Sequence, residues 1–149
     1  MLGYQHPDAS MTLRQGIDEY FASDATLTDP DTCSPGAAEL FRRHDAIHVL
    51  FGTNRDIVQE AWTDAWTLFG TTAGWRDFMA YTKEPEVVGV IGEIGYWETF
   101  VGSLRSVPGV FRIWRRSKQM REPWPWDAYA QHYDEPLDAL RERYGISLL

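Results

Sequence analysis

Residues 37–60, AAELFRRHDAIHVLFGTNRDIVQE, decide the fold of this chain. The spacing of apolar residues predicts a helix over residues 37–51. Successive residues of a helix are rotated by about one hundred degrees, which places both His44 and His48 within its apolar stripe. Burying an imidazole without a partner costs about 1–3 kcal/mol, so two on one apolar face require partners. Helical side chains four residues apart have Cβ atoms about 5–6 Å from each other, so both rings can bind one metal ion. The alternative is a pair of core histidines hydrogen-bonded to the main chain.

A second helix is predicted directly after the first. Gly52 is a natural left-handed cap for the first helix, and N-capping residue types follow it at Thr53, Asn54 and Asp56. We expect the two helices to fold back on each other as antiparallel neighbours. The inner face of the second helix is expected at the apolar residues Ile57, Ala61, Ala65 and Leu68.

The two helices together predict a metal site. Glu60 and Asp64 are expected on the rim of the second helix, with Glu60 within reach of the histidine pair. Asp45 lies on the shoulder of the first helix's apolar stripe. This arrangement predicts that the histidine pair binds a metal ion beside these acids. The residue types do not identify the metal, because two imidazoles with carboxylates suit zinc, iron or manganese.

These residues also carry a resemblance to a known family. The pattern His-Asp-x-x-His, followed after eleven residues by Glu, resembles the signature of the coenzyme Q biosynthesis protein 4 family. Gly52 fits that signature, and residues 136–146 are similar to the family's closing helix. The resemblance covers residues 38–146 and is specific at the metal motif.

The resemblance implies an all-helical ubiquinone biosynthesis protein that binds zinc through the matching residues His44, Asp45, His48 and Glu60, beside a hydrophobic tunnel for a polyprenyl chain. Asp45 and Glu60 are then the candidate catalytic groups, either as resting ligands or as general bases when a ligand exchanges. The implied activity is oxidative C1 decarboxylation of a polyprenyl hydroxybenzoate, which would make the protein a lyase. The alternative is a non-catalytic, lipid-binding scaffold that organises other quinone biosynthesis enzymes. The expected partners are a polyprenylated aromatic or other isoprenoid lipid, those enzymes, and a second copy in a homodimer.

Two hydrolase interpretations rank lower. His-Asp-x-x-His resembles the zincin His-Glu-x-x-His helix, but aspartate is one methylene shorter and presents its carboxylate differently to a metal-bound water. An HD-type phosphohydrolase needs a further upstream histidine and a distant aspartate, and His6 is the one histidine that precedes the pair.

A face of small residues is the second unusual feature. We expect a long helix from Pro85 past Gly102 that ends at Pro108-Gly109. A glycine costs a helix about 1 kcal/mol relative to alanine. Glycines gathered on one face of this helix therefore indicate that a partner packs closely against its backbone. A neighbouring helix is one such partner. The other is a hydrocarbon tail, with predicted lipid-binding residues Gly92, Gly95, Tyr96, Thr99 and Gly102.

Residues 111–121 place five positive charges among aromatic residues, in a chain of net charge −8. Each cation near an anionic bilayer is worth about 1 kcal/mol. This predicts head-group or membrane contact at Arg112, Arg115, Arg116 and Lys118. The alternative is a solvated face paired with the acidic residues Glu98, Glu122 or Asp127. Trp124 and Trp126, which follow, are either interface anchors or core residues.

Length and composition limit the remaining choices. The 149 residues suit one all-α domain, a helical bundle with an N-terminal helix and loop (1–34) and a family-like core (35–149). Thr12 and Gln15 form a capping box that opens the N-terminal helix. The acidic balance argues against nucleic acid as a partner. The single Cys33 and the absence of a recognisable signal peptide predict a cytoplasmic protein, peripheral on the inner membrane.

Overall fold

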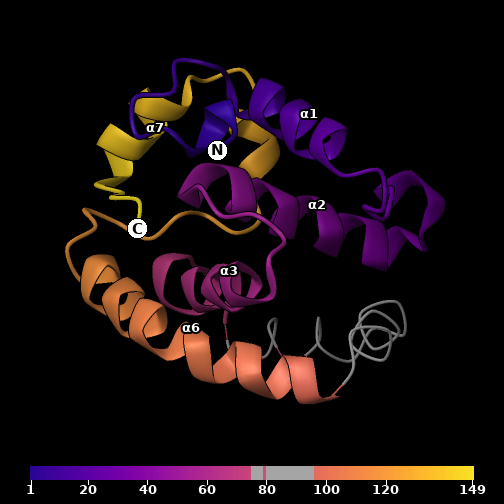
Figure 1. The fold of residues 1–149 in the computed structure, drawn as a ribbon. Coiled ribbons are helices and arrows are strands. Elements are labelled where there is room, and N and C mark those ends of the chain that lie inside the picture. Colours follow the sequence, from indigo (N-terminus) through magenta and orange to yellow (C-terminus); the bar gives the residue numbers. More distant parts are fainter. Residues whose placement is uncertain (75–78, 80–95) are drawn as a thin grey trace.

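The computed structural model describes residues 1–74, 79 and 96–149, and for residues 96–101 and 103 it describes the main chain alone. The described residues form five α-helices, and their strand-like pairing is confined to two isolated bridges. The predicted all-α fold is therefore confirmed (Figure 1). The helices are α1 (Leu13–Ser23), α2 (Pro35–Phe51), α3 (Ile57–Gly70), α6 (Tyr96–Ser117) and α7 (Leu137–Tyr144).

Helix α1 begins at the predicted capping box. Thr12 Oγ1 accepts from the Gln15 main-chain N–H at 3.2 Å, and Gln15 Oε1 accepts from the Thr12 N–H at 2.9 Å. The helix packs closely on α2, since a Cβ atom at Gly16 would lie 2.5 Å from Cγ1 of Val49. A glycine at this position lets the two backbones approach each other.

Helix α2 is the central element of the fold. Ser34 caps its start by accepting from the Ala37 N–H at 3.4 Å. Gly52 ends it as predicted, with a left-handed φ of 71° and its N–H directed at the carbonyls of His48 and Val49. All eight residues from 44 to 51 are buried, so this helix is covered on every side over its second half.

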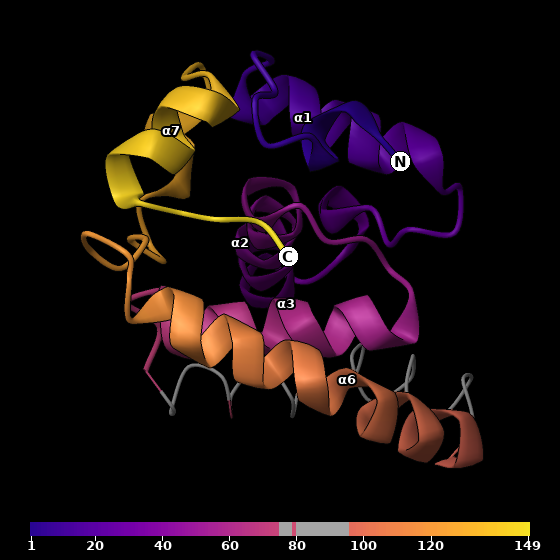
Figure 2. The same ribbon diagram turned by 60° about the vertical axis from the view of Figure 1, so that its left-hand side comes forward.

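Helices α2 and α3 are not antiparallel as expected. Figure 2 looks almost along α2 while α3 lies across the view, so the two helices cross steeply. The buried residues of α3 also differ from the predicted inner face: Ala65 is buried, but Ile57, Ala61 and Leu68 are only partly covered. Burial is instead centred on Thr63, Trp66, Thr67 and Gly70. The reason is that α3 lies between α2 and α6, so it has two inner faces.

Helix α6 runs through the expected break at Pro108-Gly109. A proline inside a helix costs about 3 kcal/mol, because its missing N–H cannot bond to the residue 104 carbonyl. The packing of α6 along α3 offsets this cost. A Cβ at Gly109 would lie 2.1 Å from Nε1 of Trp62, which donates to the Ser106 carbonyl at 3.1 Å. The expected start of this helix at Pro85 lies outside the described residues.

The chain after α6 folds back into the core. Trp124 is fully buried and Trp126 nearly so, which confirms the core interpretation of this pair. The Trp124 N–H donates to the Gly70 carbonyl at 2.8 Å and so ties this segment to the end of α3. Helix α7 then packs beside the start of α1, where the Leu13 N–H donates to the Glu135 carbonyl at 3.0 Å.

Arg141 on α7 fastens three parts of the chain together. Its buried guanidinium donates to the carbonyls of Val49 and Leu50, each at 2.9 Å, and to those of Tyr4 and His6, each at 2.6 Å. Burial lowers the pKa of Arg141 to about 10, so it stays charged at neutral pH. The cation thus lies at the C-terminal end of α2, where the helix dipole favours positive charge.

Candidate metal centre

Three side chains from α2 and α3 converge at the crossing of these helices. His44 and His48 lie one turn apart on α2, and Glu60 lies in the first turn of α3. Glu60 Oε2 is 3.3 Å from His48 Nε2, and Glu60 Oε1 is 3.7 Å from His44 Nε2. One ligand atom from each of the three residues lies within 4.8 Å of the others. Two imidazole nitrogens and one carboxylate oxygen at this spacing could hold a metal ion.

The site is shielded from solvent on the histidine side. His44 and His48 are 4% and 1% exposed, and their rings meet edge to face with centroids 4.8 Å apart. Tyr20 of α1 stacks on the outer face of His48. Glu60 is more open, with 38% of its side chain exposed, so a ligand can approach from its side.

Two threonines orient His48. Its Nδ1 lies 3.1 Å from Oγ1 of Thr63 and 3.2 Å from Oγ1 of Thr53. The Thr63 hydroxyl can donate to the Gln59 carbonyl at 3.0 Å, which leaves its oxygen able to accept from Nδ1–H. A metal at Nε2 requires the tautomer that carries its proton on Nδ1, and the Thr63 oxygen is placed to accept that proton.

His44 has a different electrostatic environment. Its Nε2 is 3.7 Å from Oδ1 of Asp64 as well as 3.7 Å from Glu60. Burial disfavours the imidazolium, but the carboxylates of Asp64, Glu60 and Asp45 more than offset this and raise the pKa of His44 to about 9. In the metal-free protein a proton therefore supplies the positive charge that these carboxylates require.

His48 and Glu60 have lowered pKa values. Burial lowers the pKa of His48, which keeps its ring neutral at pH 7 although Glu60 opposes the effect. Burial alone would raise the pKa of Glu60, but the two histidines hold it well below its usual range. The centre at neutral pH thus contains a neutral imidazole and a carboxylate in ligand-ready form.

Asp45 is buried on α2, but its carboxylate is not part of the group of three ligand atoms. Burial raises its pKa to about 7, and the charge of Glu60 adds to this shift. The structure therefore brings together His44, His48 and Glu60 from the predicted ligand set. The ligand role of Asp45 stays a prediction.

Sequence reasoning missed Tyr20, Thr53 and Thr63 as neighbours of the centre, and it placed Asp64 beside Glu60 on the rim of the second helix without giving it a role. Thr63 and Asp64 stand three and four residues after Glu60, a spacing that places them on the same helix face. That spacing was a usable signal. Tyr20 comes from a distant helix, and nothing in its local sequence indicates that it stacks on His48.

Comparison with known protein families, curated proteins and solved structures found no match to this chain. The case for a metal centre therefore rests on the geometry of the three side chains and on the sequence pattern.

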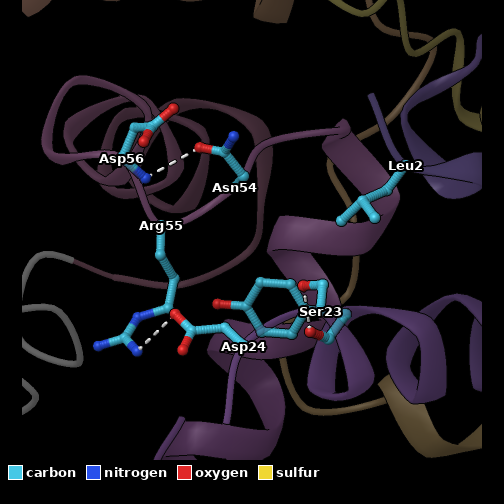
Figure 3. A pocket seen from close by; sticks show the side chains of 7 residues that line it. Leu2, Ser23, Asp24, Asn54, Arg55 and Asp56 are labelled. Carbon is cyan, nitrogen blue, oxygen red and sulfur yellow. Dashed lines mark hydrogen bonds and ion pairs between the residues drawn. The ribbon is translucent and has the colours of Figure 1, made fainter. Parts of the chain in front are cut away.

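An open pocket of about 330 Å³ lies next to the centre. Figure 3 shows Arg55 and Asp24 meeting across it, where Arg55 Nη1 lies 3.4 Å from Asp24 Oδ2. Tyr20 lines this pocket and also stacks on His48, so its side chain contacts both the pocket and the centre. The lining residues are Leu2, Tyr20, Ser23, Asp24, Asn54, Arg55 and Asp56.

The predicted lipid-binding residues can be placed only in part. Gly92 and Gly95 lie outside the described residues, and Tyr96 and Thr99 are described by their main chain within α6. At Gly102 the close approach is made by a neighbouring helix, since a Cβ there would lie 2.9 Å from Cγ1 of Ile57 on α3. Helix packing thus accounts for the glycine at this one position.

The positively charged side chains of residues 111–121, the cationic segment, are mostly exposed. Arg112, Arg115 and Lys118 are exposed, whereas Arg116 is partly buried and donates to the Ser147 carbonyl at 3.2 Å. Asp127, one of the acids considered as a partner for this segment, is instead 2.6 Å from Nη1 of Arg43. None of the described helices combines the length and the hydropathy needed to cross a bilayer.

Proposed function

We propose that this chain is a zinc-dependent ubiquinone biosynthesis protein that removes the C1 carboxylate of a polyprenyl hydroxybenzoate. The observation that carries the proposal is the convergence of His44, His48 and Glu60, one ligand atom from each, within 4.8 Å. The sequence pattern that connects these residues supplies the second support, through its resemblance to the coenzyme Q biosynthesis protein 4 family.

The number of ligands favours catalysis over a purely structural role. Catalytic zinc sites use three protein ligands and keep a position for water or substrate, whereas structural sites use four. When bound, zinc acts as a Lewis acid that polarises a carboxylate or phenolate oxygen of the substrate. The partly exposed Glu60 lies on the side from which such a substrate would enter.

The remaining residues have distinct proposed roles. Thr63 holds His48 in its ligating tautomer, and Tyr20 excludes water from the same ring. Asp45 and Glu60 are the groups assigned to proton transfer. In the overall reaction the bond from the ring carbon to the carboxylate breaks and carbon dioxide leaves, water supplies the hydroxyl that replaces it, and dioxygen takes up the two electrons and two protons released to become hydrogen peroxide.

One observation favours the scaffold alternative. Asp64 Oδ1 lies 3.7 Å from His44 Nε2, so a fourth protein carboxylate is available to close the site. A closed tetrahedral site would hold α2 and α3 together without leaving a position for substrate. The protein would then bind an isoprenoid lipid and organise other quinone biosynthesis enzymes without turnover.

The deciding experiment incubates zinc-loaded protein aerobically with a short-chain prenyl hydroxybenzoate and follows loss of the carboxylate by mass spectrometry. Turnover is expected in the native protein and in His6→Ala, an exposed histidine outside the centre. No turnover is expected in His48→Ala. A zinc-replete native protein that leaves the substrate intact would contradict the catalytic proposal and support the scaffold.

A further inference from the structure

Helix α6 exposes its largest apolar side chains. Leu104, Val107, Phe111 and Trp114 are 59%, 58%, 56% and 43% exposed, although fully or mostly buried side chains are typical of such residues. Their spacing of three, four and three residues places them along one face of the helix. We name these four residues the apolar stripe. The rings of Phe111 and Trp114 stack on each other, with centroids 5.7 Å apart.

The opposite face of α6 accounts for this arrangement. Gly102, Ser106, Gly109 and Ile113 are buried, and three of these four are small. They bring the α6 backbone close to Ile57 and Trp62 of α3. The helix thus buries its small residues and exposes its large apolar ones. An ordinary amphipathic helix does the reverse and packs its large apolar side chains against the core of its own domain.

Position and charge limit what covers the apolar stripe. In Figures 1 and 2, α6 forms one edge of the described part of the molecule, with α3 between it and α2. Arg105, Arg112 and Arg115 are exposed beside or within the stripe. This concentration of positive charge stands in a chain of net charge −8. A negatively charged surface complements it, and a second copy of this acidic chain does so less well.

We propose that α6 is an interfacial helix that lays its apolar stripe onto an anionic lipid bilayer. Leu, Phe and Trp side chains on one face with arginines alongside are typical of helices that lie in the plane of a membrane surface. Arginine can extend its charge toward lipid phosphates while its aliphatic stem covers apolar surface. This surface would act independently of the metal centre, although it would hold the centre near substrates that reside in the bilayer.

Vesicle flotation tests this proposal. The full-length protein is mixed at low salt with phosphatidylcholine vesicles that either contain or lack phosphatidylglycerol. Binding to the anionic vesicles is expected, with about tenfold weaker binding to the neutral ones. Phe111→Ser combined with Trp114→Ser should weaken binding to anionic vesicles about tenfold or more. Arg112→Gln combined with Arg115→Gln should remove the preference for anionic lipid.

Two matched controls separate the stripe from general effects. Leu149→Ser removes another exposed apolar residue outside α6, and Arg14→Gln removes an exposed charge on α1, so both should bind vesicles like the native protein. His48→Ala should also bind normally, which makes the result independent of the proposed zinc chemistry. The proposal is overturned if the native protein stays with neither vesicle type, or if the stripe variants float as well as it does. The proposal would also be overturned if the stripe substitutions dissociated a homodimer and left vesicle flotation unchanged.

Discussion

The ring of Tyr20 lies flat on the ring of His48, with centroids 5.0 Å apart and an interplanar angle of 21°. The first helix of the chain therefore forms a wall of a centre whose three ligand atoms come from α2 and α3. A change at Tyr20 should therefore affect both the packing of α1 and the shielding of His48.

Replacement of Tyr20 tests this connection. Tyr20→Ala removes a buried ring and should lower the free energy of unfolding by about 3–5 kcal/mol. Tyr20→Phe keeps the stacked ring and should cost less than about 1.5 kcal/mol. Urea unfolding of the metal-free proteins measures both values. Equal losses in the two variants would show that the hydroxyl, and not the ring, matters at this position.

The threonine contact to His48 predicts a change in metal affinity. Thr63→Val removes one of the two hydroxyl oxygens next to Nδ1 of His48 and should weaken zinc binding about 10–100-fold, as is typical when a partner of a ligating histidine is lost. Thr67→Val is the matched control, because this buried threonine lies one turn later and donates to the Thr63 carbonyl. Competition titration with a zinc chelator gives both affinities. Similar affinities in the two variants would remove the proposed orienting role of Thr63.

The pKa of His44 predicts how pH affects the metal-free protein. A pKa raised to about 9 in the folded state, from 6.5, means that the folded protein holds this proton more tightly than the unfolded chain. The stabilisation is present below pH 6.5 and is lost as the pH rises toward 9. Asp45 has a pKa of about 7, so the decline above pH 8 reports on His44. Urea unfolding at pH 8 and pH 9 should show this loss in the native protein and a flatter profile in His44→Gln.

Zinc affinity should rise with pH, whereas the stability of the metal-free protein falls. The metal requires a deprotonated imidazole, so apparent zinc affinity should rise with pH until about 9, and binding at pH 7.5 should release about one proton. Calorimetry in buffers of different ionisation enthalpy counts the proton. Zinc binding without proton release would show that His44 is not a ligand.

Local signals predicted much of this structure. The capping box at Thr12 and the left-handed Gly52 each satisfy main-chain groups within a few residues, so sequence alone locates these helix ends. The convergence of His44, His48 and Glu60 followed from helical spacing and a short connection.

Features set by long-range packing were missed or wrongly predicted. Pro108 normally ends a helix, but contacts between α6 and α3 outweigh its cost. The crossing of α2 and α3 depends on what α3 packs against on its other side. Thr63 lies at a buried position because the ring of His48 requires a polar neighbour, a need that hydrophobic periodicity does not register.

The buried guanidinium of Arg141 predicts a large stability effect from a residue far from the metal centre. Arg141→Met leaves four main-chain carbonyls without this donor and should cost about 3 kcal/mol or more in free energy of unfolding. Arg143→Gln, on the exposed side of the same helix, removes only a surface pair with Glu135 and should cost less than about 1 kcal/mol. Chemical unfolding measures both, and comparable losses would contradict the fastening role of Arg141.

Zinc binding tests the central claim most directly. Metal-free protein titrated with zinc should take up about one equivalent, with binding abolished in His48→Ala, strongly weakened in Glu60→Gln and unchanged in His6→Ala. An absence of stoichiometric zinc in the native protein, or equal uptake by Glu60→Gln and His6→Ala, would contradict a metal centre at the crossing of α2 and α3.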